Sequence, residues 1–175
     1  MIKSNENIAY HEAGHAVAYF EFGKMIRNVT IVPSEKYLGC CFGYCIHFPS
    51  LDVGQIAPAI REQVENEITN FFIGALAEKR FLGRRPEGWI KLTEIHNAVD
   101  LASNLTGSNR QLNAYLSWLY VIADEFIYEK EEHWEAIQAI AQELLKKKTL
   151  YGKEAHQIWR SISIARIDHR FRLYD

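Results

Sequence analysis

The apolar positions of the first 20 residues follow the spacing of an α-helix. Ser4, a residue type that often caps a helix N-terminus, precedes the pattern, and Gly23 follows it. The apolar positions are Ala9, Ala13, Ala16, Val17 and Phe20. Because they recur every three or four residues, a helix is predicted from Ser4 to about Gly23.

The next two segments change to patterns typical of β-strands. Residues 28–33 (NVTIVP) are rich in β-branched side chains and close with a proline. Residues 37–49 (YLGCCFGYCIHFP) alternate, with smaller or polar residues on one face. The opposite face carries Leu38, Cys40, Phe42, Tyr44, Ile46 and Phe48. Together the two segments predict a β-hairpin.

Helical spacing returns in residues 57–83, with Pro58 near the start and Gly83 at the end. The apolar stripe of this long helix is Ile60, Val64, Ile68, Phe71, Phe72 and Ala75. Four further helices are expected at about 94–105 (capped by Thr93), 108–129, 132–148 and 153–163. The predicted fold is therefore mainly α (α+β), with a small β-hairpin or sheet at about residues 28–48.

The length and composition predict one domain. The chain has 175 residues, of which 48% are hydrophobic, enough to bury a core. We assign residues 1–165 to this domain and 166–175 to a C-terminal tail, a solvated end rather than a binding arm. The aromatic group Tyr115, Trp118, Tyr120 and Phe126 is interpreted as core rather than interface.

The charge balance argues against polyanionic partners. Twenty Lys and Arg face 22 Asp and Glu, so neither nucleic-acid binding nor a polybasic membrane patch is expected. The uncharged run 111–123 is shorter than the roughly 18 apolar residues that a membrane span needs. The N-terminal residues lack the apolar region of a secretory signal, and we therefore expect a cytoplasmic protein.

The three cysteines, Cys40, Cys41 and Cys45, suit a reducing compartment because their number is odd. On a strand Cys41 and Cys45 would be about 13 Å apart, too far to share one zinc ion. A reduced, partly buried trio is therefore preferred to a cysteine metal site.

The candidate chemistry lies in the first predicted helix, where His11, Glu12 and His15 form His-Glu-x-x-His. Residues four apart project from one face of a helix, so both histidines can reach one metal ion, and Glu12 can take a proton from a metal-bound water. The alternative is two solvated or core histidines. Gly14, inside the helix, predicts that another backbone crosses closely there.

A catalytic zinc also needs a third protein ligand. Glu94, His96 and Asp100 lie on or next to one predicted helix, and their spacing leaves the choice open. The other histidines are interpreted as surface or satisfied core residues: His47, His133, His156 and His169.

Four segments, between about residues 7 and 162, resemble the peptidase domain of the FtsH-type ATP-dependent zinc metalloproteases. They are AYHEAGHAV (9–17), VTIVP followed by Leu38 and Gly39, IGALAEKRFLG (73–83) and AIAQELLKKKTLYGKEAHQIW (139–159). The resemblance implies a helical zincin-like fold and one zinc per chain.

The resemblance also implies residue roles. Zinc would be held by His11, His15 and Glu94, where the family has an aspartate in place of Glu94, and Glu12 would be the general base. Asp100 would be a second-shell or surface group. For Glu78, a hydrogen bond to a ligand histidine and a surface salt bridge are held equally. Leu38 and Gly39 would belong to the strand that binds substrate.

Two departures from the family matter. The 175 residues contain no Gly-x-x-x-x-Gly-Lys-Ser/Thr pattern, so we expect ATP-independent action on short peptides or unfolded proteins, with a homo-oligomer or a separate ATPase as further partners. Ile73 and Ala75 replace a family glycine and arginine, which can alter packing or an oligomer contact.

The expected function is that of a zinc metalloendopeptidase. The alternative is a weak or inactive peptidase-like module that binds partner proteins, and a zinc hydrolase of other substrates is a lesser third reading.

Overall fold

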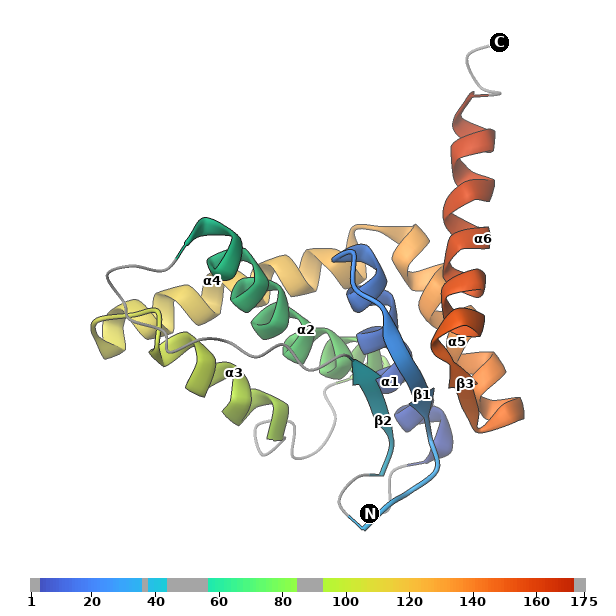
Figure 1. Cartoon of the computed structure of the whole chain (residues 1–175), viewed down its shortest axis with the longest axis horizontal. Helices are drawn as coiled ribbons and strands as arrows, with labels where there is room; N and C mark the ends of the chain where they lie inside the picture. The colour runs from blue at the N-terminus through green and yellow to red at the C-terminus, as the bar shows by residue number, and fades with distance from the viewer. Residues whose placement is uncertain (1–3, 36–37, 44–56, 85–92, 172–175) are drawn as a thin grey trace.

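The computed structural model describes residues 4–35, 38–43, 57–84 and 93–171, and it is mainly helical with one small antiparallel sheet (Figure 1). The helices are α1 (Asn5–Glu21), α2 (Pro58–Leu82), α3 (Thr93–Ser103), α4 (Asn109–Tyr128), α5 (Glu131–Lys147) and α6 (Gly152–Phe171). The strands are β1 (Ile26–Thr30), β2 (Cys40–Gly43) and β3 (Thr149–Tyr151). This confirms the predicted mainly α, α+β fold.

Helix α1 is the centre of the molecule. It begins as predicted, because the Ser4 side chain accepts a hydrogen bond from the backbone N–H of Asn7. Every residue from Ile8 to Ala18 is buried, since α2, α5 and the sheet pack around the helix. A Cβ on Gly14 would lie 2.9 Å from Cβ of Ala77 on α2, which confirms the predicted close crossing.

Helix α2 has the predicted ends. Pro58 is its first residue, where the missing N–H costs nothing, and Gly83 ends it with φ of 65°, a left-handed conformation that glycine adopts without strain. Ile73 and Ala75, the two departures from the family pattern, are both buried in the core beside α1. They therefore affect packing and are not exposed to an oligomer partner.

The sheet has the order β2-β1-β3, and all its described pairs are antiparallel. The pairing of β1 with β2 confirms the hairpin, although Tyr44, Cys45, Ile46, His47 and Phe48 lie outside the described residues. Strand β3 was not predicted. Its three residues are too few for a periodic signal, and Leu150 is placed opposite Val29 only by the tertiary fold.

The alternation in β2 did not indicate which face of the strand is buried. Cys41 packs on the core because it pairs with the fully buried Val29, and directly opposed residues share a face of a sheet. Phe42 points the other way and is 44% exposed. Cys40 and Cys41 form no disulfide and are half-buried, as expected.

The C-terminal helices differ from prediction in two respects. Helix α6 runs to Phe171, beyond the expected end near residue 163 and into the expected tail, and it projects away from the body (Figure 1). Among the aromatic group, Phe126 is buried as predicted, and Tyr115 and Tyr120 pack against the core, but Trp118 is half exposed. None of the helices described is long and apolar enough to cross a bilayer.

Candidate metal centre

Three side chains from two helices converge on one point. His11 and His15 come from α1, and Glu94 comes from the first turn of α3. Nε2 of His11 lies 3.2 Å from Nε2 of His15 and 3.7 Å from Oε1 of Glu94. The three ligand atoms lie within 4.8 Å of one another, and no other such group is found in the described parts of the chain.

These separations fit a small cation. Two nitrogen ligands at about 2.0–2.1 Å from a tetrahedral zinc are about 3.3 Å apart. Nε2 of both histidines faces the same point, and two imidazoles plus a carboxylate form a donor set typical of catalytic zinc. These residues can therefore hold a zinc ion and leave one position for water or substrate.

The acidic groups around the metal position favour the binding of one positive charge, either a proton or a metal ion. Burial lowers the pKa of His11, but the carboxylates of Glu78 and Glu94 outweigh it and raise this pKa to about 9. The contact with His11 lowers the pKa of Glu94 to about 2, although burial opposes it. Burial and the neighbouring His11 lower the pKa of His15 to about 4. Without metal, a proton on His11 therefore supplies the positive charge that the acidic groups favour.

Helix α2 supplies a partner for each histidine. Nδ1 of His11 is 3.5 Å from Oε2 of the fully buried Glu78, an ion-pair distance longer than an ordinary hydrogen bond. Nδ1 of His15 is 3.1 Å from Oδ1 of Asn70, a hydrogen bond between buried groups. Each Nδ1 thus faces α2, while each Nε2 faces the metal position.

Two residues of α2, Asn70 and Gly74, also belong to the site and were not predicted. The ring of His15 lies directly over Gly74, where a Cβ atom would overlap three atoms of the imidazole. A glycine inside a predicted helix is a signal that could have marked this close approach. No such signal marks Asn70, because its contact spans 55 positions of sequence.

A cavity of about 190 Å³ opens beside the centre. Its lining includes Glu12 and His15 from α1, Gly39 and Cys40 from the β2 side, and Glu94 from α3. Glu12 is buried and lines the same cavity as His15 and Glu94. Burial and the nearby Glu12 and Glu94 raise the pKa of Cys40 to about 11, which keeps this thiol protonated.

The remaining candidates lie elsewhere. Asp100 and His96 are exposed on α3 and do not join the group of ligands. His133 is a satisfied core histidine, as predicted, because Nδ1 is 3.0 Å from the carbonyl of Phe126. His156 packs against Phe20 and Trp159. The side chains of His47 and His169 are outside the described residues.

The two residues of the expected substrate strand differ in environment. Gly39 lines the cavity, and a Cβ at this position would lie 3.1 Å from Cγ of Glu12. Leu38 is 51% exposed. The chain therefore passes close to Glu12 at Gly39, a position without a side chain.

The sequence model of peptidase family M41 matches residues 2–105. ATP-dependent zinc metalloprotease FtsH of Buchnera aphidicola subsp. Schizaphis graminum is 30% identical over 106 residues, 57% of this chain and 16% of that protein. FtsH of Haemophilus influenzae is 29% identical over 105 residues, 59% of this chain and 15% of that protein. FtsH 2 of Thermoanaerobacter sp. is 24% identical over 185 residues, 91% of this chain and 34% of that protein. The chain spans about a sixth of the first two relatives and about a third of the last.

Proposed function

This chain belongs to peptidase family M41, and we propose that it is a zinc-dependent metallopeptidase that hydrolyses peptide bonds of short or unfolded polypeptides. The observation that carries the proposal is the convergence of His11, His15 and Glu94 beside the cavity that Glu12 lines. We infer one zinc per chain, held by these three side chains. When bound, zinc acidifies a coordinated water and polarises the carbonyl that the water attacks.

Glu12 is the general base of the proposed reaction. It directly follows His11 in α1, is buried, and borders the cavity, so its carboxylate can accept the proton of the attacking water. The same carboxyl group then returns this proton to the leaving amine. One residue therefore serves as base and then as acid in the two halves of the reaction.

The edge of the sheet is suited to align a polypeptide. Strand β2 is an edge strand, so one side of its backbone has no partner strand within the described sheet. An extended substrate can add to this edge through main-chain hydrogen bonds, as in other β-augmentation complexes. Gly39 at the start of this segment leaves room next to Glu12.

All proposed catalytic groups belong to this one domain, so the bond cleavage itself is proposed to need no ATP. The relatives named above are ATP-dependent zinc metalloproteases, and the chain matches only part of each. Association with a separate ATPase, or with further copies of this chain, would serve to deliver folded substrates and is proposed as such.

The test combines zinc content with cleavage of an unfolded protein such as casein, with and without ATP. We expect wild type to carry about one zinc and to cleave without ATP. Glu12→Gln should keep the zinc and lose at least about 100-fold in cleavage rate, because general-base catalysis contributes on this order. Glu6→Gln, an exposed substitution of the same type on α1, is the matched control.

A protein that binds zinc and an unfolded chain but cleaves nothing would contradict the hydrolase proposal. It would favour the alternative, a peptidase-like module that binds partner proteins. Absence of zinc after exposure to an excess of the ion would contradict both the metal centre and the peptidase.

A further inference from the structure

His15 can act as a metal ligand through Nε2 only if its ring proton sits on Nδ1. A neutral imidazole carries one proton, and the hydrogen bond at one nitrogen decides which nitrogen keeps a free lone pair. In His15 the neighbour of Nδ1 is the side chain of Asn70, and the backbone of Asn70 also makes a hydrogen bond with the ring. An asparagine amide offers either an oxygen acceptor or a nitrogen donor, so the orientation of the Asn70 side chain decides which of the two faces Nδ1 of His15.

A line of buried and half-buried groups fixes that orientation. Lys24 and the Tyr19 hydroxyl both donate to the carboxylate of Glu67, with Nζ at 3.3 Å and the hydroxyl oxygen at 3.0 Å. Because an ionised carboxylate only accepts, the Tyr19 O–H proton points to Glu67, and the Tyr19 oxygen is left as an acceptor. The side-chain amide of Asn70 acts on this hydroxyl as a donor, because it opposes the rise in the pKa of Tyr19 that burial and Glu67 cause.

The direction of each hydrogen bond follows from this sequence of partners. Since the Tyr19 oxygen is left as an acceptor, it suits the NH₂ group of Asn70 and not its Oδ1 atom. The Oδ1 atom of Asn70 is then turned toward His15, where it lies 3.1 Å from Nδ1. An oxygen at that position can only accept, so the proton of His15 belongs on Nδ1.

We propose that Asn70 is a positioning residue that holds His15 as the Nδ1–H tautomer, and that Tyr19 and Glu67 hold the amide of Asn70 in the orientation this requires. The Nε2 lone pair of His15 then faces the metal position before any metal arrives. The inference rests on the proposed function only in naming zinc as the ion.

The residues that surround the His15 imidazole support this assignment. Asn70 is only 2% exposed and borders the cavity beside the centre, so its side chain is held within the fold next to the ring of His15. The ring of His15 lies against Gly74, one turn further along α2. Contact with Gly74 thus fixes the position of the ring, and the hydrogen bond with Asn70 fixes its tautomer.

The first test is ¹⁵N NMR of the histidine rings in metal-free protein at neutral pH, which distinguishes the two neutral tautomers of His15. We expect the Nδ1–H tautomer in wild type and in Asn70→Asp, which keeps an oxygen acceptor. Asn70→Leu should lose this preference, and Tyr19→Phe should weaken it. A wild-type His15 with its proton on Nε2 would overturn the proposal whether or not the protein is a peptidase.

The second test is the zinc dissociation constant, measured by competition with a chelator, together with the visible spectrum of the Co²⁺-loaded protein. Asn70→Leu should raise the dissociation constant by about 10- to 100-fold, the usual cost of losing a hydrogen-bond partner of a ligand histidine, and should change the Co²⁺ spectrum. Asn70→Asp keeps the oxygen acceptor and should bind zinc at least as tightly as wild type.

Thr69→Val is the matched control, because it removes the polar group of the neighbouring buried residue on α2. It should leave the dissociation constant within about twofold of wild type. Circular dichroism of each variant checks that it is folded. A folded Asn70→Leu protein with wild-type zinc affinity and an unchanged His15 tautomer would overturn the inference, while loss of peptidase activity alone would bear only on the proposed function.

Discussion

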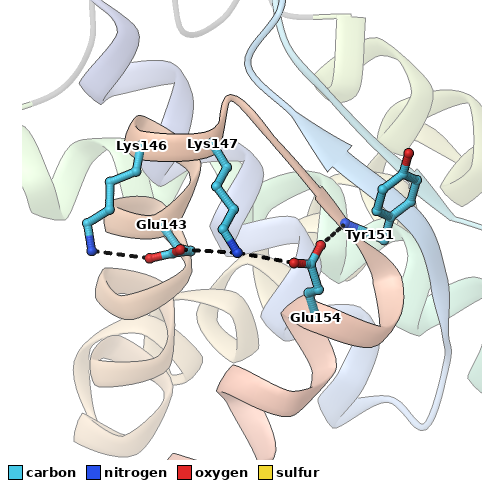
Figure 2. A network of polar contacts seen from close by, with 5 residues as sticks. All are labelled: Glu143, Lys146, Lys147, Tyr151 and Glu154. Atoms are coloured by element: carbon cyan, nitrogen blue, oxygen red, sulfur yellow. Dashed lines mark hydrogen bonds and ion pairs between the residues drawn. The ribbon is translucent and has the colours of Figure 1, made fainter.

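The metal centre and the surface at the α5–β3–α6 corner each carry a group of ionisable side chains, but they differ in burial. At the corner, Lys147 lies between two carboxylates, with Nζ 3.3 Å from Glu143 and 3.1 Å from Glu154 (Figure 2). The side chains of Lys146 and Lys147 are 71% and 50% exposed. At the metal centre, the histidines and Glu78 are buried.

Burial of the histidines explains why the pKa shifts are larger at the metal centre than at the corner. Water screens the corner, so the lysines lower the pKa of Glu143 and the carboxylates raise that of Lys147 without a large shift. At the centre, Glu94 is itself 31% exposed, but its partner His11 is buried, and their contact moves the pKa of Glu94 to about 2, while Glu78 and Glu94 raise that of His11 to about 9. Similar polar contacts therefore have stronger effects where at least one partner is buried, here His11.

The largest expected effect is the loss of a metal ligand. Glu94→Ala should reduce zinc from about one per chain to almost none, because two histidines alone leave the ion without its carboxylate. Asp100→Ala, an exposed acidic residue on the same helix, should retain full zinc. Elemental analysis of both variants, purified without chelator, decides between them. Zinc retained by Glu94→Ala and lost by Asp100→Ala would reverse the assignment.

The next effect separates two glycines at the crossing of α1 and α2. Gly74→Ala places a methyl group against the ring of His15 and should weaken zinc binding at least about 10-fold. Gly14→Ala instead meets Ala77 and should cost about 1–3 kcal/mol of unfolding free energy, offset in part by a better helix propensity. Chelator competition and urea unfolding measure the two quantities. Equal zinc affinities of the two variants would contradict the inference that zinc binding needs the space that Gly74 leaves for the His15 ring.

An intermediate effect is expected at Glu21, which is 29% exposed and accepts a hydrogen bond from Nε1 of Trp159 at 2.7 Å. Burial raises the pKa of Glu21, but contacts with His133 and Trp159 outweigh it and lower the pKa below 4.5. The ionised form is thus favoured by folding, and its contribution is present above pH 4.5 and lost as pH falls through the lowered pKa.

Glu21→Gln should therefore reduce the free energy of unfolding by about 1 kcal/mol at pH 7, and the difference from wild type should vanish in acid. Urea unfolding of both proteins between pH 3 and 7 tests this. Glu62→Gln, an exposed residue on α2, controls for the loss of a surface charge. A difference that grew as the pH fell would have the wrong sign for a lowered carboxyl pKa.

The smallest effect is expected at the corner itself. Lys146→Ala should leave the thermal midpoint within about 2 °C of wild type, because its partner Glu143 keeps a second cation in Lys147. Glu154→Ala should do more than Lys146→Ala, since Glu154 also accepts the backbone N–H of Tyr151 at the start of α6. A large destabilisation by Lys146→Ala would show that exposure is a poor guide to the importance of these contacts.

The sequence by itself determined the features that depend on near neighbours. Helical spacing and capping residues located α1 and α2 to within a few residues, because these signals act within one or two turns. The same local geometry put His11 and His15 on one face of α1, since residues four apart always lie together on a helix. The family resemblance singled out Glu94, which the structure brings to the two histidines.

The tertiary structure alone decided the contacts between distant segments. Cys41 and Leu150 both pair with Val29, so Cys41 faces the core and Leu150 belongs to a third strand. Neither segment has a sequence pattern that specifies this pairing. The crossing of α1 and α2 brought Asn70 to His15 across 55 positions. Periodicity reports which face of an element is buried, but not which residue of another element will meet it, because that depends on how the whole chain packs.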